Sequence, residues 1–370
     1  MSNDCKRAIA VVQRAVLVKN LDILAQNSKT SLVRFQGAIA MLKANAYGHG
    51  LVESARAFLQ SKNCHALGIA DFLEGIELRN SGIKKPIWIF SGQAPLTDEV
   101  ISQCRKFQLT PILSNVSDIQ KYSRAALRKD TPRFHIKINT GMNRLGVEMS
   151  ELGEVIKVIK SSKNCEGICT HFAQALLEDS ALTRKQIRNF QFAYSLFSHF
   201  NIPQIHAANS AAVLNQKLLK QIAFTNIVRP GIGLYGYADE RGIRAGLKPA
   251  LKLKAKVIQS RTLKKDDLVG YDGTFKAHSS TNQSVLALGY GDGFHRILSN
   301  QKILIRNKTT QILGRVSMDM LSINAFLKIG SWVTILGDGH KQMEIMANQA
   351  ETISYEILTS LTSRVLRQYK

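Results

Sequence analysis

Lys43 begins the octapeptide KANAYGHG, directly after the apolar run 37–42. If that run is a strand of a barrel, the lysine stands at the strand's carboxyl end, where barrel enzymes place their functional residues. An amine that is desolvated there can lose its proton, and a neutral amine is what Schiff-base formation with an aldehyde cofactor requires. The simpler alternative is a lysine whose stem lies along the strand end with its ammonium group in water.

Two later segments, 206–210 and 228–233, contain residues that can bind an anion. Ser210 can cap the following helix and present a hydroxyl and backbone amides to a phosphate, although an Asn-Ser pair before an apolar run is also an ordinary helix start. Gly231 lets backbone N–H groups approach a phosphate closely. Arg229 stays protonated and can only donate, so it would leave a pyridine nitrogen beside it unprotonated. The alternative for Arg229 is an ion pair at a barrel rim.

The elements that must position these residues follow a repeating pattern. From about residue 37 onward, short apolar, β-branched runs alternate with helical segments such as 151–161, where apolar residues recur at spacings of three and four. The pattern predicts about eight βα units, which fit a closed (β/α)₈ barrel. The expected strands are 37–42, 66–70, 87–90, 110–113, 134–138, 167–171, 204–207 and 227–229.

Past residue 240 the pattern changes. From Leu251 to Val257 apolar residues alternate with lysines at period two, which is typical of strands with one buried face. Further strands are expected at 284–288, 302–306, 311–314 and 332–336. We therefore expect an α/β chain with a TIM-like barrel in residues 1–240, from which part of the N-terminal segment can return to the second domain, and a mostly β domain in residues 241–370.

The composition excludes several classes of protein. Fifty Lys and Arg against 27 Asp and Glu give a net charge of +23, but no three basic residues are consecutive, so the chain lacks the basic arm of a nucleic-acid-binding protein. Five cysteines without a C-x-x-C pair argue against a disulfide framework and a zinc site. No apolar run approaches the ~18 residues of a membrane span. We expect a cytoplasmic protein with no metal, no membrane and no nucleic-acid partner.

The octapeptide at Lys43 resembles the cofactor-lysine motif of alanine racemases, which are fold-type III pyridoxal-phosphate enzymes, and further segments match this family in order through most of the chain. The resemblance implies pyridoxal 5'-phosphate as the cofactor, covalently held by Lys43. It also implies that Arg229 contacts the ring nitrogen, which restrains side reactions of the cofactor. Other implied cofactor contacts are Tyr47, His171, Asn209, Ser210, Gly231, Ile232 and Tyr355.

Inversion of a stereocentre needs a proton donor and acceptor on each face of the substrate. Tyr271, in the segment VGYDGTF, resembles the family's catalytic tyrosine and would face Lys43, while His171 could link it to Arg229. Arg144, in KINTGMNRLG, would hold the substrate carboxylate with its planar donors. Lys137 matches a lysine that carries a CO₂-derived carbamate in many relatives. Tyr290, Met318 and Asp319 are the remaining implied substrate contacts.

The resemblance further implies a homodimer, because in this family the β domain of one subunit completes the barrel site of its partner. Its substrate would be alanine, and its product D-alanine for bacterial peptidoglycan. The family's usual aspartate is Asn139 here, which makes the carbamate less secure, and its usual C-terminal proline is Leu366. Broad-specificity racemases and barrel-type decarboxylases are alternatives within the fold, although Arg229 argues against a decarboxylase. A basic nucleic-acid-binding or cofactor-carrier protein is the alternative from another class.

Overall fold

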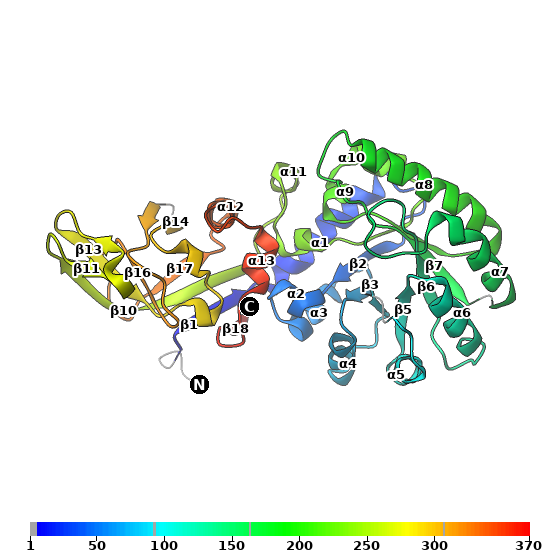
Figure 1. Cartoon of the computed structure of the whole chain (residues 1–370), viewed down its shortest axis with the longest axis horizontal. Helices are drawn as coiled ribbons and strands as arrows, with labels where there is room; N and C mark the ends of the chain where they lie inside the picture. The colour runs from blue at the N-terminus through cyan, green and yellow to red at the C-terminus, as the bar shows by residue number, and fades with distance from the viewer. Residues whose placement is uncertain (1–5, 92–93, 163, 306–307) are drawn as a thin grey trace. The chain divides into compact units, whose positions relative to one another are not determined.

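The computed structural model describes residues 6–91, 94–162, 164–305 and 308–370 (Figure 1). These residues form two compact units. The first, called the barrel unit here, comprises 17–46 and 51–247. The second, called the β unit, comprises the described residues up to Val16, the short segment 47–50, and residues 248–370.

The barrel unit is a closed ring of parallel strands, which confirms the predicted (β/α)₈ barrel. Its strands read as short, fully buried apolar runs because both faces are covered, one by the barrel interior and one by helices. Most predicted strands begin or end within one or two residues of the observed ones. The strands are β2 (Gly37–Met41), β3 (Cys64–Ile69), β4 (Ile87–Ile89), β5 (Leu109–Leu113), β6 (Phe134–Lys137), β7 (Cys165–Cys169), β8 (Gln204–His206) and β9 (Ile227–Val228).

Helices surround this ring, as Figure 1 shows for α3 to α8. They begin at side-chain caps that the sequence supplies: Asp71, Thr97, Asn115 and Ser180 each accept a backbone N–H of the first turn that follows. The helices are α1 (Arg14–Lys29), α3 (Leu51–Phe58), α4 (Phe72–Asn80), α5 (Asp98–Phe107), α6 (Val116–Ala125), α7 (Leu152–Ser162), α8 (Ala181–Phe197), α9 (Ser210–Leu214), α10 (Gln216–Gln221) and α11 (Glu240–Arg244). Among the described residues, no helix is long and apolar enough to span a membrane.

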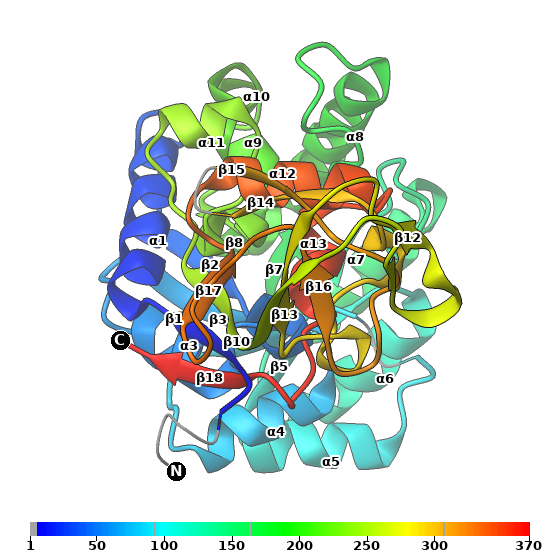
Figure 2. The same ribbon diagram turned by 90° about the vertical axis from the view of Figure 1, so that its left-hand side faces the viewer.

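The β unit is built on the long strand β10 (Leu251–Leu263). Its sheet has the order β16-β13-β10-β1-β18, with β17 also paired to β10. The N-terminal strand β1 (Ala8–Val12) pairs antiparallel with β10 and parallel with β18, beside which it runs in Figure 2. The other strands are β13 (Thr281–Leu286), β16 (Leu321–Ile323), β17 (Trp332–Leu336) and β18 (Leu366–Tyr369), with two hairpins, β11 (Leu268–Val269) with β12 (Phe275–Lys276) and β14 (Lys302–Ile305) with β15 (Lys308–Gln311).

Two details of the β unit differ from the predicted pattern. The strand expected at 311–314 is instead observed at Lys308–Gln311, and Gly314 adopts a positive φ of 74°, where its missing Cβ allows the Val269 carbonyl to approach. Two helices also form, α12 (His340–Gln349) and α13 (Ser354–Thr359). The strand expected at 302–306 is observed over Lys302–Ile305, and Arg306 lies outside the described residues.

Candidate active site

Lys43 begins a rare left-handed turn at the carboxyl end of β2. The next four residues, Ala44 to Tyr47, have φ angles of 53°, 54°, 53° and 50°, although each non-glycine residue in this region costs roughly 1–2 kcal/mol. Asn45 holds the turn: its Oδ1 accepts from the backbone N of Leu51 at 2.7 Å, and its own N–H donates to Glu74 at 3.2 Å. The sequence indicated a strand followed by a helix, and only Asn45 and the nearby glycines hinted at this conformation.

The turn leaves the Lys43 side chain exposed at the end of the strand, in a region of cationic groups. Burial of its amine lowers the pKa of Lys43, and the charge of Arg144 lowers this pKa further, while Glu74 opposes the shift. Both main causes favour the neutral amine.

Arg229 follows β9 and is 6% exposed. Its Nη1 donates to His206 Nδ1 at 2.8 Å, and its Nη2 donates to the carbonyls of Thr170 at 2.5 Å and Ala207 at 3.2 Å. The ring of Phe90 lies 5.7 Å from the guanidinium carbon. Burial lowers the pKa of Arg229, but arginine remains charged in proteins. The side chain is therefore a fixed cation deep in the barrel mouth.

His171 lies beside this cation, with its Nδ1 3.4 Å from Arg229 Nη2. Burial, followed by the charges of Arg229 and Arg144, holds the pKa of His171 well below its usual value, so the imidazole is neutral. Because arginine can only donate, Nδ1 must be the acceptor and the proton must reside on Nε2. His171 therefore offers an Nε2–H donor to a further group.

Ser210 is arranged differently from the sequence prediction. The helix cap of α9 is Asn209, whose Oδ1 accepts from Ala212 N at 3.0 Å, and not Ser210. Ser210 lies one residue inside the helix, so its Oγ is free of the capping role and accepts from the backbone N–H groups of Gly231 at 2.9 Å and Gly233 at 3.1 Å. A hydroxyl that accepts two hydrogen bonds must direct its own proton outward as a donor. Ile232 begins the short helix after Gly231.

The segment after β6 carries Lys137 and Arg144. Lys137 is 7% exposed, and burial lowers its pKa; Cys169 opposes this shift, while Arg144, Arg229 and Lys43 add to it. Arg144 itself is exposed. A buried lysine surrounded by cations favours the neutral amine, which is the form that reacts with CO₂.

Asn139 organises the same segment. Its Oδ1 accepts from the backbone N–H groups of Gly141 at 3.2 Å and Asn143 at 3.0 Å, while its Nδ2 donates to Glu148 Oε1 at 2.7 Å. An aspartate at this position could accept the first two bonds but could not donate to a carboxylate. The asparagine therefore suits the loop that leads to Arg144, because it binds an acidic residue at the loop's far end.

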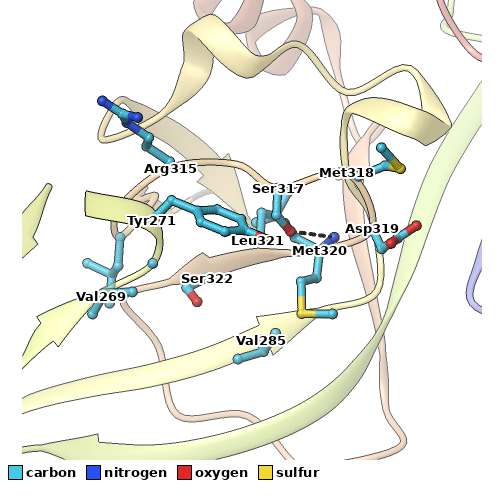
Figure 3. Close-up of a pocket in the computed structure, with 12 residues that line it drawn as sticks. Val269, Tyr271, Val285, Arg315, Ser317, Met318, Asp319, Met320, Leu321 and Ser322 are labelled. Atoms are coloured by element: carbon cyan, nitrogen blue, oxygen red, sulfur yellow. Dashed lines mark hydrogen bonds between the residues drawn. The ribbon is translucent and has the colours of Figure 1, made fainter. Parts of the chain in front are cut away.

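In the β unit, Tyr271, Met318 and Asp319 line one pocket of about 520 Å³ (Figure 3). Tyr271 lies in a short turn after β11 and is 70% exposed. Figure 3 shows its ring between Arg315 and the loop 317–320, which a hydrogen bond from Met320 N to Ser317 Oγ closes. Asp319 is held by Arg364, whose hydrogen bond at 2.5 Å is the main cause of a lowered pKa for this carboxyl.

Tyr290 approaches the same loop through its backbone, donating to the Ser317 carbonyl at 3.0 Å. The preceding Gly289 permits this approach, because a Cβ there would lie 2.3 Å from two carbonyl oxygens of the loop. Both Tyr290 and Met318 are exposed. Four of the residues selected from the sequence are therefore gathered on one face of the β unit.

Tyr47 and Tyr355 form a second group in the β unit, with ring centroids 6.0 Å apart. Burial raises the pKa of both phenols. Each keeps its proton at neutral pH and can donate it to an anion. In the part of the chain that the structure describes, no group of three or more His, Cys, Asp or Glu side chains is placed to hold a metal ion.

Comparison with known families identifies this arrangement of domains. The N-terminal domain of alanine racemases matches residues 15–239, and their C-terminal domain matches residues 250–369. The chain belongs to the alanine racemase family. Curated relatives of this name include those of Hahella chejuensis, 35% identical over 95% of this chain and 96% of the relative, and Carboxydothermus hydrogenoformans, 36% identical over 95% and 98%.

Solved structures of the alanine racemase family share the fold along the whole chain. The alanine racemase of Acinetobacter baumannii is 30% identical, covers 99% of this chain and 100% of its own, and superposes with a TM-score of 0.84. That of Bartonella henselae, solved with covalently bound pyridoxal phosphate, is 28% identical over 98% and 99% of the two chains, with a TM-score of 0.85. The predicted family, fold and isomerase class are thus confirmed.

Proposed function

We propose that this chain interconverts L-alanine and D-alanine with pyridoxal phosphate held covalently by Lys43. The observation that carries the proposal is the placement of Lys43 at the carboxyl end of β2, where its surroundings lower its pKa, in a chain of this family. When bound, the cofactor supplies an electron sink that acidifies the α-proton of an amino acid. The relatives are named alanine racemases, which favours alanine over other small amino acids as substrate.

The residues of this chain fit the cofactor. Arg229 is a fixed donor suited to an unprotonated ring nitrogen, and Ser210 directs its hydroxyl proton outward. Tyr47 and Tyr355 are neutral phenols suited to a phosphate. We assign the phosphate to Tyr47, Ser210, Gly231, Ile232 and Tyr355, with Asn209 and His171 as further cofactor contacts. Since Gly231 N–H donates to Ser210, the serine links that glycine to the phosphate.

Two bases would act on opposite faces of the substrate. In one direction Lys43, as the neutral amine, would accept the α-proton on one face while the Tyr271 hydroxyl donates its own proton to the other. In the reverse direction the Tyr271 anion would accept the α-proton and the Lys43 ammonium would donate. A tyrosine normally holds its proton, so Tyr271 needs a neighbour that stabilises its anion. His171 supplies an Nε2–H donor for that task, because its Nδ1 faces Arg229. Arg144 would bind the substrate carboxylate, with Tyr290, Met318 and Asp319 lining the substrate pocket.

The exposure of Tyr271 supports a homodimer with shared sites. A catalytic phenol that is 70% exposed in a single chain needs a second surface to exclude water, and the barrel of the partner subunit would provide that surface. Lys137 would carry a carbamate that neutralises the surrounding cations and positions Arg144. The role of the product D-alanine would be as a cytoplasmic precursor of bacterial peptidoglycan.

A direct experiment tests the activity. Purified protein is incubated with pyridoxal phosphate and either L-alanine or L-serine, and the D-enantiomer and the visible absorbance of bound cofactor are measured. We expect D-alanine from the parent protein and a loss of at least about a thousandfold in Lys43→Ala, since a covalent catalyst is removed. Lys157→Ala, on an exposed face of α7, is the matched control and should be fully active. A colourless, inactive parent protein would refute the proposal.

A further inference from the structure

A row of buried polar side chains crosses the interior of the barrel beneath Arg229. Arg229 Nη1 contacts His206 Nδ1 at 2.8 Å, and His206 Nε2 contacts His135 Nδ1, also at 2.8 Å. His135 Nε2 then lies 3.4 Å from Glu166 Oε1. Both imidazoles have no accessible surface, and the Glu166 carboxylate is partly exposed, with 20% of its side-chain surface accessible. The row therefore joins the candidate cofactor residue to a carboxylate from the start of β7.

The chemistry of the two ends allows one arrangement of protons. Arginine has only donors, so His206 Nδ1 must accept and its proton must be on Nε2. That proton is donated to His135 Nδ1, which leaves the proton of His135 on Nε2, directed at Glu166. A carboxylate can only accept. Both hydrogen bonds of the row thus point from Arg229 toward His135, whose Nε2–H faces the Glu166 carboxylate at 3.4 Å.

The arrangement requires both imidazoles to be neutral, and their surroundings favour this. Burial, followed by Arg229, holds the pKa of His206 well below its usual value. Burial also lowers the pKa of His135, although Glu166 opposes this shift, with a smaller contribution from Gln204. Gln204 is thus a second, uncharged neighbour of the His135 ring.

The barrel is shaped to hold the His135 ring. The ring centroid of Trp88 lies 4.2 Å from it. On the neighbouring strand, a Cβ at Gly167 would lie 2.2 Å from His135 Nδ1, so the absence of a side chain at that position leaves room for the imidazole. A row that is fixed by packing and by hydrogen bonds can transmit an orientation, because neither ring can turn without losing a bond.

We propose that Glu166 is a positioning residue for Arg229, which acts by holding the His135 ring, and through it the His206 ring, in the orientation that their Nε2–H tautomers require. With the carboxylate facing His135 Nε2–H, both rings keep their orientation and His206 Nδ1 holds one arm of the guanidinium. The remaining donors of Arg229 would thereby be held in place for a cofactor nitrogen. This inference rests on the proposed function only in that Arg229 contacts the cofactor; the row of hydrogen bonds belongs to the protein alone.

The tautomers can be measured without any cofactor. In apoprotein labelled with ¹⁵N-histidine, long-range ¹H–¹⁵N spectra distinguish Nε2–H, Nδ1–H and charged imidazoles, and His135→Gln and His206→Gln variants assign the two signals. We expect both rings to be neutral Nε2–H forms in the parent. In Glu166→Ala both rings should remain Nε2–H, since Arg229 can still only donate, but the His135 Nε2–H signal should shift and broaden because the ring loses the carboxylate that faces it, whereas Glu166→Gln, which keeps an acceptor oxygen, should retain the parent pattern.

Binding and activity complete the test. We expect Glu166→Ala to weaken pyridoxal-phosphate binding and racemisation by about tenfold, because a buried imidazole N–H loses the charged group that faces it, and Glu166→Gln to restore most of it. Glu154→Ala, at an exposed position of α7, is the control for a lost carboxylate. An Nδ1–H or charged ring in the parent, or parent-like spectra and binding in Glu166→Ala, would overturn the inference. If the parent bound no cofactor but showed both Nε2–H tautomers, only the proposed function would fail.

Discussion

Some candidate residues of the barrel unit and of the β unit are held in opposite ways. In the barrel, Arg229 and Lys137 are buried, their surroundings lower their pKa values, and Arg229 is fixed by several hydrogen bonds. In the β unit, Tyr271, Tyr290 and Met318 are exposed on one face. The difference teaches that the barrel arranges its electrostatics by itself, whereas the β unit presents side chains that a second surface must cover before they can act in a dry site.

Mixing two inactive variants would test that difference with the largest expected effect. Lys43→Ala and Tyr271→Phe should each lose activity by roughly a hundredfold or more. If each site takes Lys43 from one subunit and Tyr271 from its partner, a mixed dimer contains one intact site. Random exchange of equal amounts should then recover about a quarter of the parent activity. Racemisation is followed after the variants are mixed, diluted and reconcentrated.

The matched control for this mixture is Lys43→Ala combined with the double variant Lys43→Ala, Tyr271→Phe. No dimer of those chains contains an intact site, so its activity should stay at background. A tag on one variant shows whether the subunits have exchanged. If they have exchanged and the first mixture still recovers no activity, Lys43 and Tyr271 of one site belong to the same chain, and the β unit needs no partner surface.

Much of the barrel could be predicted from sequence because its strands are fully apolar runs and their order is set by the βα repeat. Arg229 and Lys43 could also be selected as candidate residues from the sequence, since arginine can only donate hydrogen bonds and a lysine at a strand end can be desolvated. The left-handed turn at Ala44 could not be predicted, because its conformation depends on distant partners such as Glu74. The row from His206 to Glu166 was missed for the same reason: its members lie far apart in sequence and meet only inside the barrel.

The segment that interrupts the barrel unit provides a test of stability. Gly48 has a φ of 77°, and a Cβ there would lie 2.0 Å from the Leu358 carbonyl oxygen. Gly82, in the barrel unit, has a similar φ of 86° but open space around it. We expect Gly82→Ala to lower the free energy of unfolding by about 1 kcal/mol through backbone strain alone, and Gly48→Ala by roughly 3 kcal/mol or more, because the carbonyl must move.

Chemical unfolding of both variants measures these values. Equal losses of stability in Gly48→Ala and Gly82→Ala would show that the backbone near residue 48 can move to accept a Cβ. The inference that residues 47–50 are closely packed within the β unit would then be wrong.

Lys137→Met tests the smallest effect, the stored electrostatic strain of the barrel. The pKa of Lys137 is lowered in the folded chain. At neutral pH, folding therefore moves a charged amine from water to a place where its charged form is less stable. The resulting loss of stability is fully present below the pKa of Lys137 in the folded chain. It disappears as the pH rises to the ordinary pKa of 10.5, because between these two pKa values the unfolded chain binds more protons than the folded chain. In CO₂-free buffer, Lys137→Met should therefore be more stable than the parent at neutral pH, by on the order of 1 kcal/mol.

The advantage of Lys137→Met should shrink as the pH approaches 10.5, whereas Lys157→Met, at an exposed position, should show no such trend. Added bicarbonate should also reduce it, because a carbamate would convert Lys137 into an anion among Arg144, Arg229 and Lys43, and the intact mass should then rise by one CO₂. Thermal unfolding across pH, with and without bicarbonate, measures both trends. If Lys137→Met is less stable than the parent in CO₂-free buffer at neutral pH, the folded chain stabilises the Lys137 amine, and burial of this amine does not lower the stability of the barrel.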